Sequence, residues 1–197
     1  MLNREYFFSV SKTIRLFTKF SQRQVDSLNC IFDKWDASGY ADLRWLAYML
    51  ATCYHETDKT MLPIEEYGKG KSRPYGKKIK HSGVSYSTPN KIYYGRGYVQ
   101  LTWYENYELM SRLIYNDNRL LIEPELLLDY KVAADVMFEG MTKGSSSFGD
   151  FTGKCLEMYF NDKVNDPLNA RRIINGKDKA AKISAHHSDF LICLKVA

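Results

Sequence analysis

The chain has 197 residues and a formal net charge of +5, and hydrophobic residues make up 45% of it. That length suits one domain whose core needs neither disulfides nor a metal. The positive charge is compatible with nucleic acid, a membrane surface or an anionic cell-wall polymer, and composition does not choose among them. The four widely spaced cysteines contain no C-x-x-C pair and indicate buried, reduced thiols.

The N-terminal segment, residues 3–20, predicts one or two short helices. Charged residues interrupt its apolar run, so it predicts neither a signal peptide nor a membrane span; these are Arg4, Glu5, Lys12 and Arg15. We therefore expect synthesis in the cytoplasm. A protein of this kind that acts on the cell wall would need another route of release.

Two helices are expected next. Ser21 and Gln24 have the spacing of a capping box, and Gly39 is a typical helix stop. Between them the apolar residues recur at helical spacing: Val25, Leu28, Ile31, Phe32 and Trp35. The second helix begins at about Asp42 and ends near Glu56. One face of it carries Trp45, Leu46, Met49, Leu50 and Cys53.

The helical pattern stops over residues 58–92, where Pro, Gly, Ser and Lys dominate. We expect a long loop or a small β-hairpin beside a cleft, because loops of this length in compact domains are usually functional. Its Lys69–Lys80 segment holds six basic residues and no acid. Such a run is usually a solvated loop, but it can also attract an anionic polymer. Nucleic acid is a rival ligand, although no nucleic-acid-binding motif accompanies the run.

Helices return after the loop. Thr102 and Glu105 predict a capping box for a helix that ends near Tyr115. Further helix starts are expected at Pro124, Asp129 and Asp166-Pro167, and the last of these helices should end at Asn175-Gly176. A Ser/Gly-rich connection runs from Gly144 to Gly153, and a final amphipathic helix carries Ile183, His186, Phe190, Leu191 and Leu194. Without repeats or linkers, residues 1–197 are expected to form one mainly α-helical domain.

Glu56 is the sharpest candidate for chemistry. It lies at the edge of the apolar stripe and in the last turn of its helix. Burial and the helix dipole both raise the pKa of a carboxyl group there, which suits a proton donor near neutral pH. A boundary Glu paired with a lysine is an equally simple interpretation. A zinc-protease motif is excluded because Lys59 stands where the second His is required. We expect no metal and no cofactor.

A second carboxylate is available at Glu65 or Glu66, since glycosidic hydrolysis uses two carboxyl groups. A solvated loop acid is the simpler interpretation of either residue. The glycines on both sides of Arg96 permit a tight backbone that presents its guanidinium to a carboxylate. Gln100, Thr102 and Asn106 follow at spacings that allow them to line one wall of a site.

Taken together, these segments resemble glycoside hydrolase family 19, the chitinases and their phage endolysin relatives. The resemblance spans most of the chain. It lies in Tyr54-His55-Glu56-Thr57, in the run from Pro63 to Gly70, in Tyr93 to Trp103, in Asn106-Tyr107 and in Ile173-Ile174-Asn175-Gly176. The opening residues Asn3 to Phe8 and the segment Ser21 to Val25 are similar to the endolysin branch.

The resemblance implies a lysozyme-like bilobal helical fold and single-displacement hydrolysis with inversion. It implies that Glu56 is the general acid and that Thr102 helps to hold the attacking water. The substrate-binding positions that we assign are Arg96, Tyr98, Gln100, Asn106 and Asn175. The loop after Glu56 departs from the plant chitinases, so Glu65 is the best stand-in for the base, with Glu66 as the alternative.

The resemblance leads us to expect a monomeric endolysin that hydrolyses β-1,4 bonds of bacterial peptidoglycan. The Lys69–Lys80 segment would contact anionic envelope polymers, and no nucleic acid would be bound. The alternatives are a chitinase with the same mechanism and a catalytically idle wall-binding protein.

Overall fold

The helices begin where short polar side chains accept hydrogen bonds from free backbone amides. In this computed structural model, which describes residues 1–146 and 151–195, Asn3 caps α1 (Arg4–Thr13). Ser21 and Gln24 form the expected capping box of α2 (Gln22–Ser38), which stops at Gly39 with φ 75°. Asp42 caps α3 (Leu43–Glu56), and Asp129 caps α6 (Tyr130–Lys143). These predictions are confirmed because such caps satisfy amides within one turn of the chain.

The remaining elements are shorter, apart from two helices. These are α4 (Tyr104–Tyr115) and α7 (Ala180–Leu194), the expected final amphipathic helix. A single α-helical turn, α5 (Arg119–Ile122), precedes the 3₁₀ helix η2 (Pro124–Leu128). The other 3₁₀ helices are η1 (Pro74–Gly76), η3 (Leu156–Met158) and η4 (Asn169–Ile173). The described chain is therefore mainly α-helical.

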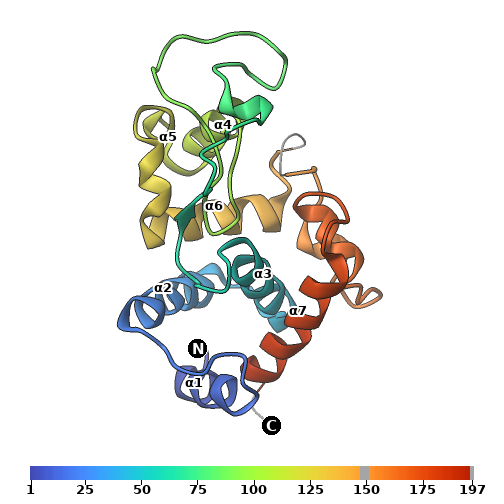
Figure 1. The fold of residues 1–197 in the computed structure, drawn as a ribbon. Helices are drawn as coiled ribbons and strands as arrows, with labels where there is room; N and C mark the ends of the chain where they lie inside the picture. Colours follow the sequence, from blue (N-terminus) through green and yellow to red (C-terminus); the bar gives the residue numbers. More distant parts are fainter. Residues whose placement is uncertain (147–150, 196–197) are drawn as a thin grey trace.

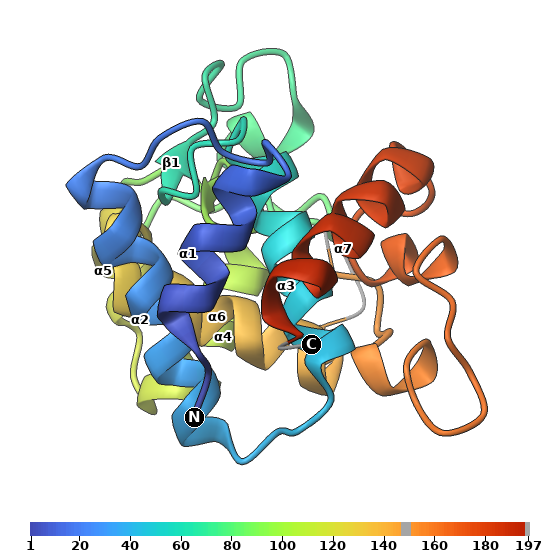
Figure 2. The ribbon, with the colours of Figure 1, turned by 90° about the horizontal axis from the view of Figure 1, so that it is seen from below.

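The core is built around α3, whose residues Leu46–Tyr54 are all buried. A helix buried on every side needs neighbours all around it. The helix α7 packs along it most extensively, and α1 packs on α7, so elements from the two ends of the chain meet (Figure 2). In Figure 1, α1, α2, α3 and α7 occupy the lower part, and α4, α5 and α6 lie above them. The helix α6 connects the two groups through its contacts with α2, α3 and α4.

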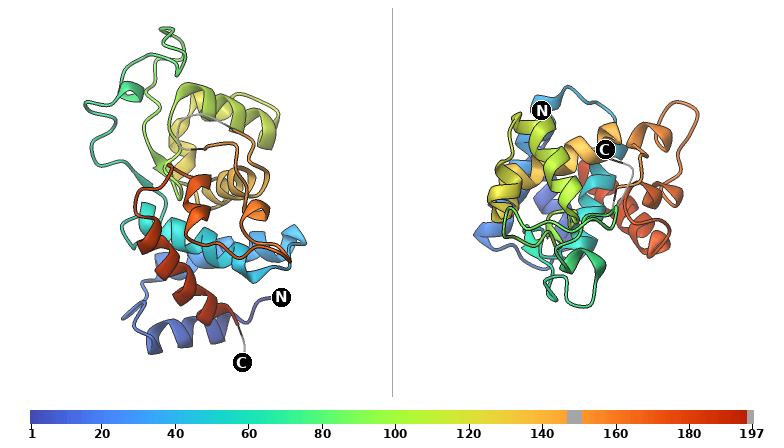
Figure 3. Two further views of the ribbon diagram at one scale, coloured as in Figure 1. Left: turned by 90° about the vertical axis from the view of Figure 1, so that its right-hand side faces the viewer. Right: turned by 90° about the horizontal axis from the view of Figure 1, so that it is seen from above.

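The segment from residue 58 to residue 92 forms the expected long excursion, which extends from one end of the molecule (Figures 1 and 3). A two-stranded antiparallel sheet joins the beginning of this excursion to the segment that follows it: β1 (Ile64–Glu65) pairs with β2 (Arg96–Gly97). Farther out, Ile79 bridges to Ser85, and the Lys80 amide donates to the Val84 carbonyl at 2.8 Å. Both alternatives, a long loop and a small hairpin turn, are thus present.

The expected capping box at Thr102 and Glu105 is wrong. The N-cap of α4 is Trp103, which has φ 72° and makes no side-chain capping bond. Its amide donates instead to the Tyr93 carbonyl at 2.9 Å. The Glu105 carboxylate accepts from the amide of His81 in the excursion at 3.0 Å. Contacts across the fold have replaced the local cap.

The helix expected after Asp166 is shorter than its sequence suggests. The Asp166 carboxylate does accept from the Asn169 amide at 3.0 Å, but only the 3₁₀ turn η4 forms. It ends before Asn175 and Gly176, which have positive φ angles of 57° and 69°. The Gly144–Gly153 connection lies partly outside the described residues. The described helices include none long and apolar enough to cross a bilayer.

Candidate functional site

Glu56 occupies the last position of α3, with its side chain 17% exposed. One of its oxygens, Oε1, accepts from Nη1 of Arg171 at 2.8 Å. Arg171 belongs to η4 and is almost fully buried. Its Nε donates to the Asp178 carbonyl at 2.8 Å, so the guanidinium is held from both sides. The expected partial burial of Glu56 is confirmed, and its ionic partner is an arginine far along the chain.

Burial raises the pKa of the Glu56 carboxyl above its ordinary value, and the charge and hydrogen bond of Arg171 oppose that rise. The expected direction is therefore confirmed, although the sequence did not indicate the opposing arginine. The neighbouring His55 is also desolvated, which lowers its pKa to about 4 and keeps the imidazole neutral at neutral pH. A carboxyl group in these surroundings is suited to donating a proton.

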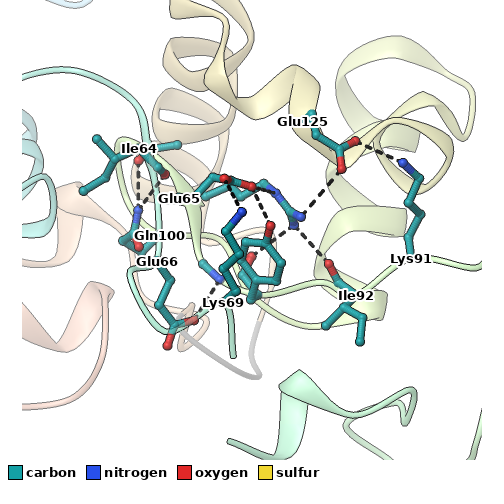
Figure 4. Close-up of polar contacts among 12 residues, drawn as sticks. Ile64, Glu65, Glu66, Lys69, Lys91, Ile92, Gln100 and Glu125 are labelled. Atoms are coloured by element: carbon teal, nitrogen blue, oxygen red, sulfur yellow. Dashed lines mark hydrogen bonds and ion pairs between the residues drawn. The ribbon is translucent and has the colours of Figure 1, made fainter. Parts of the chain in front are cut away.

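Glu65 lies on β1 directly opposite Arg96 of β2. Its Oε1 accepts from the Tyr94 hydroxyl and lies 3.5 Å from Nε of Arg96. Its Oε2 forms an ion pair with Nζ of Lys69 at 3.1 Å (Figure 4). The Tyr94 hydrogen bond lowers the pKa of Glu65, and Lys69 and Arg96 lower it further. This carboxylate is ionised near neutral pH, as a general base must be.

Glu66 is placed differently, although it is the next residue. Its carboxylate accepts from the Gly95 amide at 3.3 Å and from the Tyr75 hydroxyl at 3.2 Å. Its own amide donates to the Gly95 carbonyl at 2.7 Å. Glu66 thus fastens the excursion to the segment before β2. Of the two candidates for the base, the electrostatic surroundings favour Glu65.

Arg96 faces a carboxylate, as the flanking glycines suggested. Its side chain is only 2% exposed. The guanidinium donates to the carbonyls of Ile92 and Tyr94 and to the Tyr107 hydroxyl, and lies 3.8 Å from Glu125 (Figure 4). The expected approach of Arg96 to a carboxylate is present, with Nε 3.5 Å from Glu65, and its contact with substrate stays a prediction.

Two other assigned substrate-binding residues are buried. Tyr98 is fully buried, and its hydroxyl lies 2.6 Å from Oγ of Ser27 on α2. Asn106 is also fully buried, and its side-chain oxygen accepts from the Ser146 hydroxyl at 2.5 Å. Both side chains lie in the interior of this structure, and the assignment of Tyr98 and Asn106 to substrate binding stays a prediction.

Gln100 and Asn175 remain near the surface. The Gln100 amide nitrogen donates to the carbonyls of Ile64 and Gly97 at 3.1 and 3.2 Å, which links β1 to the turn after β2 (Figure 4). Asn175 is exposed in the turn that follows η4. It is therefore accessible to a ligand on the same segment that supplies Arg171.

Thr102 is 3% exposed. The preceding residue, Leu101, donates its amide to the Arg96 carbonyl at 2.9 Å. Arg96 in turn pairs with Glu65. Thr102 therefore follows directly on the strand segment that supports Glu65, and the residue is buried in this structure.

The two candidate carboxylates lie in ion-pair clusters of unlike character. In one, burial favours the protonated form of Glu56 beside Arg171. In the other, a hydrogen bond and two cations favour the charged form of Glu65. Two carboxyl groups whose surroundings separate their pKa values can serve as an acid and a base.

Sequence reasoning missed Arg171, although a signal existed. Two consecutive arginines, Arg171 and Arg172, stand just before the Ile173–Gly176 segment that was singled out. Arg171 is buried and Arg172 is exposed, which only the fold decides. Over the described residues, no group of three or more His, Cys, Asp or Glu side chains gathers into a metal site. The chain matches no protein-family model and no curated protein.

Proposed function

We propose that this chain is a peptidoglycan hydrolase of the phage endolysin kind, with a lysozyme-like bilobal fold. It cuts β-1,4-glycosidic bonds by single displacement. The observation that carries the proposal is the contrast between Glu56, whose pKa is raised by burial, and Glu65, whose pKa is lowered by hydrogen bonding and cations. Glycosidases require such a division of labour between two carboxyl groups.

In the proposed reaction, the Glu56 carboxyl protonates the glycosidic oxygen as the bond to the anomeric carbon breaks. Glu65 takes a proton from a water molecule, whose oxygen bonds to that carbon from the opposite face. Thr102 helps to orient this water once the site admits substrate. The proton lost by Glu56 and the one gained by Glu65 balance, and exchange with solvent restores both groups. An inverting enzyme leaves about 6.5–9.5 Å between the carboxyl groups for the water.

The Lys69–Lys80 segment supports an anionic substrate. Lys71, Arg73 and Lys77 are exposed, and the described residues offer them no ion-pair partner. Their charges are thus free to attract the acidic polymers of a cell envelope over short range. Chitin is neutral and would gain nothing from them.

The test is incubation of the purified protein with peptidoglycan and, separately, with chitin oligomers. We expect new reducing ends from peptidoglycan, and NMR of the first-formed product should show the inverted anomer. A retained anomer would exclude single displacement. Faster release of reducing ends from chitin would favour the chitinase alternative, and no release from either would leave only wall binding.

A further inference from the structure

The Oε2 oxygen of Glu65 is paired with the ammonium group of Lys69. The carboxylate has one side toward the interior, where Tyr94 and Arg96 contact Oε1, and both of these side chains are buried. On the other side, Nζ of Lys69 lies 3.1 Å from Oε2, and the Lys69 side chain is 63% exposed (Figure 4). A ligand that approaches Glu65 from solvent therefore meets the Lys69 ammonium.

The backbone holds Lys69 in this position. Its amide donates to the Glu66 carbonyl at 2.9 Å, and it has φ 46°. The next residue, Gly70, lies against Gly76 so closely that a Cβ atom added to Gly76 would be 1.8 Å from the Gly70 carbonyl oxygen. The Arg73 amide donates to the same Gly70 carbonyl oxygen at 2.9 Å. The close contact between Gly70 and Gly76, which side chains at these positions would prevent, thus holds the turn that carries Lys69 in place.

The ammonium has hydrogen-bonding capacity to spare. A lysine ammonium carries three donors, and Glu65 uses one of them. The turn itself stands in open solvent, since Tyr67 at its tip is 82% exposed. A second anionic group, on a ligand bound next to Glu65, can therefore accept from Lys69 without breaking the first ion pair.

We infer that Lys69 is a specificity-determining residue that binds a carboxylate of the substrate beside the bond to be cut. The inference rests on the proposed function and names the substrate class: a β-1,4-linked amino-sugar polymer with carboxylate-bearing substituents, such as the acidic peptides of peptidoglycan. A neutral amino-sugar polymer offers the remaining donors only uncharged acceptors, which form weaker hydrogen bonds than a carboxylate does. Lys69 would select the substrate by a contact beside the reacting bond. The other basic residues of the loop would instead attract the anionic polymer as a whole.

Lys143 provides a matched control. It forms an ion pair with Glu139 at 2.8 Å, four residues away on α6, and is 62% exposed. Lys69 and Glu65 have the same separation in sequence and nearly the same exposure. Lys69→Met and Lys143→Met therefore remove equivalent charges and ion pairs, but only the first faces the candidate site.

Binding should be measured in the Glu56→Gln background, so that ligand is not consumed. The ligands are soluble peptidoglycan oligomers with their peptides, and the same oligomers after amidation of the carboxylates. We expect amidation to weaken binding roughly fivefold, the upper range for an exposed ion pair. Lys69→Met should reduce that difference to the share contributed by the other basic residues of the loop, Lys69→Arg should retain most of it, and Lys143→Met should leave it unchanged.

Two results would overturn the inference: equal binding of the two ligands by the Glu56→Gln protein, or a preference that Lys69→Met leaves undiminished. Hydrolysis by the wild-type protein tests the proposed function separately. A Lys69-dependent preference without any hydrolysis would reject the enzyme and retain the binding site. Hydrolysis with a preference independent of Lys69 would retain the enzyme and reject Lys69 as the specificity-determining residue.

Discussion

The Arg171 guanidinium lies 2.8 Å from Oε1 of Glu56 and joins the end of α3 to a 3₁₀ turn 115 residues farther along the chain. This pair opposes the effect of burial on the pKa of Glu56, the candidate acid. Burial alone favours the neutral carboxyl, and Arg171 moderates that effect. The proton affinity of Glu56 thus depends on how two distant segments pack.

Replacing Glu56 by Gln should abolish hydrolysis and leave the fold intact. The amide retains the shape and can still accept a hydrogen bond from Arg171, but it has no proton to give. We expect a loss of about 10²–10⁴-fold in the release of reducing ends. Thermal unfolding serves as the control for folding. Substantial turnover by a well-folded Glu56→Gln protein would remove Glu56 from the acid role.

Replacing Arg171 by Met should raise the pKa of Glu56 further, because the opposing positive charge is lost. NMR titration of the glutamate carboxyl carbons measures this directly. Since a general acid must be protonated, the high-pH limb of the activity profile should move to higher pH. The free energy of unfolding should fall by about 1–3 kcal/mol as buried hydrogen bonds are lost. Arg171→Lys should show a smaller pKa change, and an unchanged Glu56 titration in Arg171→Met would contradict the electrostatic role.

Glu65→Gln and Glu66→Gln should separate the base from its neighbour. We expect Glu65→Gln to reduce turnover by about 10²–10⁴-fold, because the amide cannot take the proton from water. Glu66→Gln weakens the bonds to Gly95 and Tyr75, so it should cost about 1 kcal/mol of stability and spare most of the activity. If Glu66→Gln is the inactive variant, the base has been assigned to the wrong residue.

Replacing Lys71, Arg73 and Lys77 by Gln should weaken binding to whole cell walls roughly tenfold at low salt. Each exposed charge contributes a fraction of a kcal/mol to the binding free energy, and a total of about 1.4 kcal/mol corresponds to tenfold. Turnover of a short neutral oligosaccharide should change little. High salt should reproduce the effect on the unmodified protein, since exposed charges are screened over about 8 Å at physiological ionic strength. Wall binding that responds to neither salt nor substitution would reduce the segment to a solvated loop.

His187 should make the fold sensitive to acid. The ring is 3% exposed, stacks on Phe160 at 5.1 Å, and burial lowers its pKa to about 4. Because the folded state disfavours the charged ring, its contribution to stability is complete above the unfolded pKa of about 6.5. It is lost progressively as pH falls toward about 4, by up to about 3 kcal/mol.

His187→Phe should remove that part of the acid sensitivity, since phenylalanine can stack on Phe160 without titrating. Urea unfolding at pH 7.5 and at pH 4.5 provides the measurement. The wild-type protein should lose more free energy of unfolding between the two pH values than the variant does. Equal losses would show that His187 does not titrate within this range.

The sequence by itself determined the local features of this protein. Ser21 with Gln24, Asp42 and Asp129 each satisfy backbone amides within three residues, so their helix starts are readable without knowledge of the fold. The apolar periodicity likewise placed Glu56 at the edge of a buried face.

Tertiary structure decided everything that depends on which segments meet. Trp103 replaced Thr102 as the cap because its amide pairs with Tyr93. Tyr98 is enclosed by its contact with Ser27 on α2, which no pattern near Tyr98 reveals. The pairing of β1 with β2 gives Glu65 and Glu66 different partners. Burial and charge act through space, so the pKa shifts of the candidate acid and base belong to the fold, whereas caps and periodicity belong to the chain.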